Sequence, residues 1–271
     1  MPTLDIDGTD IYYERRGAGE PLLLLQGLGG NSLHWGEGFL GGLDDMFELV
    51  LCDYRGAGRS GALTGECTIA KLADDATALL DALAIESAHV VGISMGGMVA
   101  QELALAHPER VRTLTLGCTF PGGPEAKMTD MAVVGMLAEA VLSGDGERAL
   151  RAGYEAMIAP EYAADPANYA LYAEVAVQYQ APVPVLMAQL QAIGAHDAGA
   201  RLAGITAPTL VIHGTEDQML PVSNGRMIGE RIPGARLEIL DGVGHLFWVE
   251  QPERSAELLR EHALSGAPSG A

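Results

Sequence analysis

Ser94 has the surroundings of a catalytic nucleophile. It lies in the run GISMG (residues 92–96), which follows the apolar, β-rich run 89–93 and precedes an apolar stretch with helical spacing. A sharp turn from strand to helix leaves no room for side chains two positions before and after the serine, so glycine is required there. A similar run, GRSGA (residues 58–62), has neither the strand nor the helix. The context favours Ser94 as an exposed nucleophile over an idle serine in a packing turn.

A serine hydroxyl needs a histidine to take its proton and a carboxylate to hold that histidine in the right tautomer. His245 is the candidate base, because it follows a predicted strand in the glycine-rich loop GVGH (residues 242–245). Asp217, in the loop after the predicted strand 209–213, is the candidate acid, and Glu216 is its nearest rival. The order serine, acid, histidine is that of hydrolases with such a strand-to-helix nucleophile. The alternatives are a core histidine and a turn-forming aspartate.

The other six histidines fit the role of the base less well. Three have the wrong order relative to the serine, and the others fall in a helical segment, at a strand end and in the last helix: His34, His89, His107, His196, His213 and His262.

The tetrahedral intermediate of acyl transfer carries a negative oxygen, which preorganised N–H groups stabilise. The N–H of Met95 is one expected donor, because it follows the nucleophile directly at a helix N-terminus. The second is expected from Leu28, in the glycine-rich loop QGLGG (residues 26–30) after a predicted strand. An ordinary glycine turn is the alternative interpretation of that loop.

The elements that must position these residues alternate along the chain. Short β-rich runs separated by helical patterns predict an α/β fold with a mostly parallel sheet flanked by helices. Helical spacing over 69–83, with Thr68 as N-cap, predicts one helix, and a second runs from the turn at 96–97 to about His107. The eight predicted strands are 3–7, 11–15, 21–26, 47–53, 89–93, 111–118, 209–213 and 236–240.

From about Pro121 to Gly204 the strand-like runs disappear, and Ala, Met, Tyr and Glu recur with helical spacing. We therefore predict a core of residues 1–120 and 206–271 and a helical cap of residues 121–205. The cap should cover the site, and its Met and Tyr side chains offer an apolar, adaptable lining, although many of them should simply pack helices together. The predicted substrate-binding residues are Gly27, Met128, Met131, Met187 and Trp248.

Composition limits the function classes. Sixteen Lys and Arg against 36 Asp and Glu give a net charge of -20, which would repel nucleic acid and anionic membranes. The sequence has no apolar stretch long enough for a membrane span and starts without a basic, apolar leader, so we expect a cytoplasmic protein. Its three cysteines have no paired short spacing and predict neither a disulfide framework nor a zinc site. We expect no metal.

Four motifs together resemble the α/β-hydrolase superfamily, over almost the whole chain outside the insertion. They are GISMGG (92–97), DYRGAGRS (53–60), GTED (214–217) followed by Pro221, and Gly244-His245 followed by EQPE (250–253). The resemblance implies an eight-stranded α/β-hydrolase fold, a catalytic triad, a lid formed by the inserted helices and no cofactor. Within the superfamily the chain is similar to small bacterial carboxylesterases, enol-lactonases, methylesterases and haloperoxidase-like perhydrolases.

One residue differs from the pattern of that group. The oxyanion loop of the group usually begins His-Gly, whereas this chain has Gln26-Gly27. A serine at position 94, instead of an aspartate, speaks against haloalkane dehalogenase or epoxide hydrolase chemistry, in which a carboxylate forms the ester intermediate. We therefore expect a serine hydrolase that cleaves a small to medium, mostly apolar ester or lactone through an acyl-enzyme on Ser94.

Two alternatives remain open at this point. The first is that this chain uses the same triad for perhydrolysis, acyl transfer or carbon–carbon bond hydrolysis. The second is a non-catalytic protein that keeps the fold and binds a ligand. The expected partner is the small-molecule substrate alone. The sequence leaves open whether the protein is a monomer or a homo-oligomer.

Overall fold

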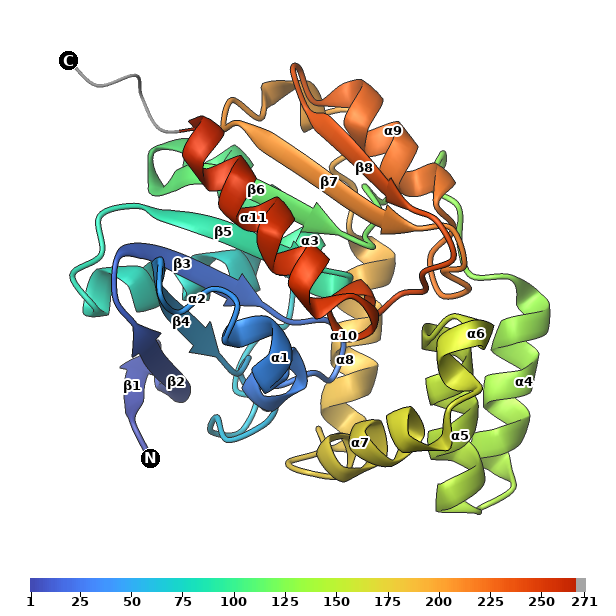
Figure 1. Ribbon diagram of the computed structural model, residues 1–271. Helices are drawn as coiled ribbons and strands as arrows, with labels where there is room; N and C mark the ends of the chain where they lie inside the picture. Colours follow the sequence, from blue (N-terminus) through green and yellow to red (C-terminus); the bar gives the residue numbers. More distant parts are fainter. Residues whose placement is uncertain (267–271) are drawn as a thin grey trace.

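The computed structural model describes residues 1–266. Its centre is one eight-stranded sheet with the order β1-β2-β4-β3-β5-β6-β7-β8 (Figure 1). Strand β2 pairs antiparallel with β1 and with β4, and all other pairs are parallel. The predicted eight-stranded, mostly parallel sheet is confirmed. The strands are β1 Thr3–Ile6, β2 Thr9–Gly17, β3 Glu20–Leu25, β4 Phe47–Cys52, β5 Ala88–Ile93, β6 Val111–Gly117, β7 Thr209–Gly214 and β8 Arg236–Leu240.

Helices cover both faces of the sheet. The α-helices are α1 Glu37–Leu40, α2 Ile69–Ala82, α3 Met95–Ala106, α4 Met131–Leu142, α5 Gly146–Met157, α6 Pro160–Ala163, α7 Pro166–Ala176, α8 Val183–Ala195, α9 Ser223–Arg231, α10 Phe247–Glu250 and α11 Pro252–Gly266. Short 3₁₀ helices are η1 Ser32–Trp35, η2 Pro108–Arg110 and η3 Leu202–Gly204. No helix within residues 1–266 is long and apolar enough to cross a membrane.

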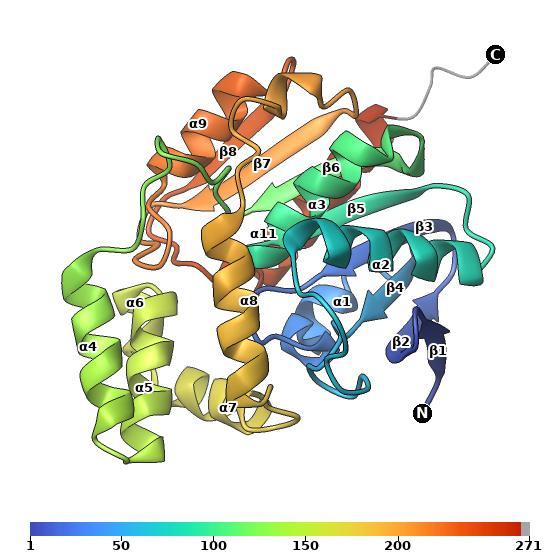
Figure 2. The same ribbon diagram turned by 180° about the vertical axis from the view of Figure 1, so that it is seen from behind.

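The central strands are apolar throughout because both of their faces are buried. In β3, Leu23 and Leu25 pack in the cluster that contains α2 and α3, whereas Leu22 and Leu24 pack in the cluster that contains α1 and α11. Figure 1 shows α11 in front of the sheet, and Figure 2 shows α2 and α3 on the opposite face. Successive strand residues point to opposite faces, so an uninterrupted leucine run serves two cores.

Local signals set the helix ends. The hydroxyl oxygen of Thr68 accepts the N–H of Lys71 at 3.1 Å, which confirms the predicted N-cap of α2. Helix α3 ends at Ala106, one residue before the predicted end, because Pro108 restricts the backbone of the residue that precedes it.

Helices α4 to α8 lie beyond the carboxyl ends of the strands (Figure 1). They belong to the segment of residues 121–205 that we predict as a cap, and we call this segment the cap. The segments that lead into and out of it meet in a short antiparallel bridge between Gly122 and Asp197. Inside the cap, Tyr154 is fully buried and packs against Tyr169 and Tyr172 with ring centroids 5.2 and 5.0 Å apart. These rings join α5 to α7 into a small apolar cluster of their own.

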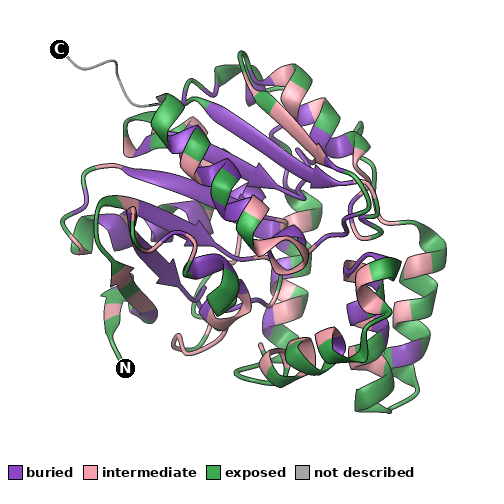
Figure 3. Ribbon diagram, viewed as in Figure 1, coloured by how far each residue is buried: buried purple, intermediate pink, exposed green. Residues whose placement is uncertain are grey.

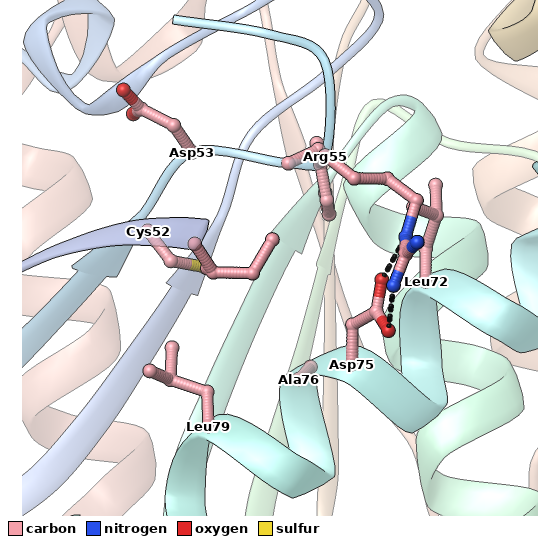
Figure 4. A pocket seen from close by; sticks show the side chains of 9 residues that line it. Cys52, Asp53, Arg55, Leu72, Asp75, Ala76 and Leu79 are labelled. Carbon is pink, nitrogen blue, oxygen red and sulfur yellow. Dashed lines mark hydrogen bonds and ion pairs between the residues drawn. The ribbon is translucent and has the colours of Figure 1, made fainter. Parts of the chain in front are cut away.

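The loop after β4 is fixed by two buried carboxylates. Arg55 donates to both oxygens of Asp75 on α2, at 2.5 and 2.6 Å, beside a void of about 10 Å³ (Figure 4). Asp53 accepts the N–H and hydroxyl of Ser32 with one oxygen and the N–H of Arg59 with the other. Removing one member of such a pair leaves a buried charge without its partner. The DYRGAGRS motif therefore has a structural role here.

Candidate active site

Ser94 occupies a strained turn between β5 and α3. Its φ of 53° and ψ of -122° lie outside the regions that L-residues favour. A Cβ on Gly92 would lie 2.2 Å from the carbonyl oxygen of Gly96, and a Cβ on Gly96 would lie 2.1 Å from that of Leu25. The turn closes only with glycine at both positions, as the sequence predicted. The N–H of Ser94 donates to the oxygen of Gly117 at 2.9 Å, which fixes the turn to β6.

The structure brings the predicted acid and base together. Nδ1 of His245, in the loop after β8, lies 2.8 Å from Oδ2 of Asp217, in the loop after β7. Oδ1 of Asp217 accepts the N–H groups of Met219 and Leu220 at 2.9 and 2.8 Å. Because the carboxylate faces Nδ1, it stabilises the tautomer with the proton on Nδ1 and leaves Nε2 free to accept a proton.

A second histidine contacts the same carboxylate. Nε2 of His213, at the end of β7, lies 3.1 Å from Oδ2 of Asp217 and 2.8 Å from the carbonyl oxygen of Leu220. Burial alone would raise the pKa of Asp217, but attraction to His245 and hydrogen bonds from His213 and His245 outweigh it and hold that pKa well below its usual range. Asp217 therefore stays ionised at neutral pH. The sequence predicts His213 only as the end of a strand; its position four residues before Asp217 was the available signal.

Glu250 and the cap hold the loop that carries His245. Oε1 of Glu250 accepts the N–H of Gly244 at 3.0 Å, and its Oε2 accepts the N–H of Ala159, after α5, at 3.3 Å. The N–H of His245 donates to the carbonyl oxygen of Met157 at 2.7 Å. Burial raises the pKa of Glu250 to about 7, although the two backbone N–H groups oppose the shift. The sequence motif contained Glu250 but did not indicate this role.

The loop with the second expected oxyanion donor passes beside the nucleophile. A Cβ on Gly27 would lie 3.2 Å from Cβ and 3.6 Å from Oγ of Ser94. Met95 is the first residue of α3, where N–H groups have no partner within the helix. Gly27, directly before Leu28, thus lies against Ser94, directly before Met95.

The predicted substrate-binding side chains separate into two groups. Met128, Met131 and Met187 belong to the cap segment and are 60%, 77% and 60% exposed. Trp248 lies elsewhere: it is buried in the core cluster with Trp35, and its indole N–H donates to the carbonyl oxygen of His34 at 3.0 Å. Its surroundings are those of a packing residue.

Cys118 is a buried neighbour of Asp217 and His245. Its sulfur and donor atoms of Asp217 and His245 all lie within 4.8 Å of one another, a spacing that a metal ion would accept. However, burial and the nearby Asp217 raise the pKa of the Cys118 thiol well above its usual value. In this structure Asp217 and His245 bind each other, since Nδ1 of His245 lies 2.8 Å from Oδ2 of Asp217.

Known proteins agree with this architecture. A family model described as the alpha/beta hydrolase fold matches residues 20–252. A protein of Azorhizobium caulinodans named "Putative carbamate hydrolase RutD" is 33% identical, over 96% of this chain and 97% of its own length. The enol-lactonase of Burkholderia xenovorans LB400 superimposes with a TM-score of 0.84 at 26% identity and covers 97% of this chain and 100% of its own. Esterase RhEst1 of Rhodococcus sp. ECU1013 gives a TM-score of 0.83 at 27% identity, over 97% and 98% of the two chains. This chain belongs to the α/β-hydrolase family of enzymes.

Proposed function

We propose that this hydrolase cleaves a small to medium, mostly apolar carboxylic ester or lactone through an acyl-enzyme on Ser94. The observation that carries the proposal is the buried 2.8 Å contact between Nδ1 of His245 and Asp217. This contact leaves Nε2 of the imidazole as the expected base for the hydroxyl of Ser94, which lies in the strained turn after β5.

The proposed reaction has two halves. Oγ of Ser94 attacks the carbonyl carbon while Nε2 of His245 takes the hydroxyl proton, and N–H groups of Leu28 and Met95 stabilise the negative oxygen. The intermediate collapses as the carbon–oxygen bond breaks, and His245 gives its proton to the leaving alcohol. Water then attacks the acyl-enzyme with the same base and acid, which releases the carboxylic acid and restores Ser94.

The relatives suggest the kind of carbonyl compound to test. Solved structures similar to this chain include an enol-lactonase and an esterase, and one relative is named for carbamate hydrolysis. A carbamate ester has the same carbon–oxygen bond, with a nitrogen on the other side of the carbonyl group. Met128, Met131 and Met187 of the cap are exposed. We predict that these adaptable apolar side chains contact the substrate, which favours one with an apolar acyl chain.

The experiment compares three matched series: p-nitrophenyl esters of increasing acyl length, γ- and δ-lactones, and p-nitrophenyl N-alkylcarbamates. We expect turnover of esters or lactones, labelling by a fluorophosphonate probe, and loss of both in Ser94→Ala. That variant should lose at least about 10⁴-fold in kcat and keep the thermal unfolding midpoint within a few degrees.

Retained turnover in Ser94→Ala would refute the nucleophile assignment. Turnover of carbamates alone would replace the ester proposal with carbamate hydrolysis. Adding hydrogen peroxide or an alcohol and analysing the products separates hydrolysis from perhydrolysis and acyl transfer. If this protein binds these compounds but turns over none of them, the result would favour a non-catalytic ligand-binding function.

A further inference from the structure

The loop beside Ser94 uses its backbone N–H groups unequally. The N–H of Gly27 donates to Oε1 of Gln26 at 3.1 Å, that of Gly29 to Oε1 of Gln189 at 2.8 Å, and that of Gly30 to the carbonyl oxygen of Gly27 at 3.1 Å. Within residues 1–266, the N–H of Leu28 has no such partner. The loop therefore keeps one donor free, between two that are occupied.

Two glutamine side chains bind the N–H groups on either side of that free donor. Gln26 and Gln189 are 4% and 0% exposed, so their carboxamides are fixed inside the protein. Their Nε2 atoms have no partner within residues 1–266, whereas each Oε1 faces a backbone N–H. This arrangement sets the direction of each amide, because a rotated carboxamide would place two N–H donors against each other.

Gln189 reaches the loop from the cap, 160 residues further along the chain. Helix α8 packs closely there: a Cβ on Gly29 would lie 2.5 Å from Cδ2 of Leu186, and Gly29 has a φ of +65°. Nearby, the side-chain amide of Asn31 donates to the carbonyl oxygen of Gln178, in the segment before α8, at 3.2 Å. Two separate hydrogen bonds thus join the cap to this loop.

We propose that Gln26 and Gln189 are positioning residues of the oxyanion hole, which hold the Gly27 and Gly29 peptides so that the N–H of Leu28 stays directed at the substrate oxygen. The inference rests on the proposed function, and it makes the cap part of the catalytic machinery. The carboxamide oxygen of Gln26 supplies an acceptor for the N–H of Gly27. Without these acceptors the glycine peptides rotate at little energetic cost, and the preorganisation of the hole is lost.

The test replaces each glutamine with methionine, which keeps the chain length and removes the acceptor. Gln191→Met is the matched control, because Gln191 is an exposed glutamine on the same helix. The substrate is the best p-nitrophenyl ester of the wild-type enzyme. The readouts are kcat, KM, the inhibition constant of phenylboronic acid, which forms a tetrahedral adduct on serine, and the thermal unfolding midpoint.

We expect Gln189→Met and Gln26→Met each to lower kcat by about 10- to 100-fold, with KM within about twofold of wild type. The boronic acid should bind more weakly by a similar factor, and Gln191→Met should match wild type. If a glutamine only packs the cap, its replacement should raise KM or lower the unfolding midpoint. The ratio of boronic acid affinity to KM should then stay unchanged.

Unchanged kcat in both variants, or a rise in KM alone, would overturn the proposal. If Gln189→Met does not fold, Gln26→Met gives the same readouts from the loop itself. The Ser94→Ala variant keeps the two proposals apart: an inactive Ser94→Ala beside normal glutamine variants removes only the positioning role, whereas an active Ser94→Ala removes the proposed function.

Discussion

The sheet core and the cap hold together in different ways. Figure 3 shows the central strands buried along their length, whereas much of the cap is exposed. In β3, Leu22 to Leu25 are at most 1% exposed; in α4, Ala140 is the single buried residue, while Val141 and Leu142 are 67% and 85% exposed. The core is stabilised by two continuous apolar layers, and the cap by a small tyrosine cluster.

Two contacts of the cap with the core lie at the loops of the candidate site. On one side, the carbonyl oxygen of Met157 accepts the N–H groups of His245 and Leu246, at 2.7 and 3.2 Å. On the other side, Gln189 accepts the N–H of Gly29 at 2.8 Å. The turn at Ser94 is thus held within the core, whereas a few directional hydrogen bonds from the cap hold the loops that carry His245 and Leu28.

The largest expected effect comes from the buried acid that the core supplies. Asp217→Asn should lower kcat by about 10⁴-fold, because the amide no longer favours the imidazole tautomer with its proton on Nδ1. Steady-state rates on the best ester measure this. Glu216→Gln is the control, since Glu216 is exposed on the same loop. Equal losses in both variants would mean that the loop matters and the carboxylate of Asp217 does not.

The same substitution made in both regions tests the difference in packing directly. Leu24→Ala, in β3, should destabilise the protein by about 2–5 kcal/mol, because it leaves a cavity among fully buried side chains. Leu142→Ala, at the exposed end of α4, should stay within about 0.5 kcal/mol. Urea unfolding of both variants gives the two free energies. Comparable losses of unfolding free energy in Leu24→Ala and Leu142→Ala would show that the surface of the cap around Leu142 is covered in solution.

The smallest expected effect lies where the two regions meet, at Glu250. Its pKa is raised to about 7 in the folded protein, against an ordinary value of 4.5, so folding favours its protonated form. The stability that this gives is complete below about pH 4.5 and is lost as the pH rises through about 7. The unfolding midpoint of wild type relative to Glu250→Gln should therefore fall between pH 5 and pH 8. Parallel curves for the two proteins would contradict the raised pKa.

Local pattern was enough to predict most of the core. Short apolar runs, separated by helical patterns, located all eight strands to within a few residues. They did so because buried parallel strands need continuous apolar sequence. The glycines around Ser94 predicted the turn, because backbone atoms fill the space where side chains would be. The cap was predicted as helical, but its partners were not: nothing in the local sequence places Gln189 against Gly29.

The sequence by itself predicted the sheet and the turn at Ser94, because both depend on residues that are close neighbours in the chain. It also gave Asp217 and His245 as candidates, through their loops and their order after Ser94. Only the tertiary structure decided that His213 shares the carboxylate of Asp217 and that Trp248 is a core residue. It also decided that Glu250 binds the N–H of Gly244 and that Gln189 binds the N–H of Gly29. The physical reason is the distance along the chain between the residues that set each feature. Backbone turns and amphipathic periodicity are local, whereas the hydrogen bonds of a buried polar side chain depend on which distant segment packs against it.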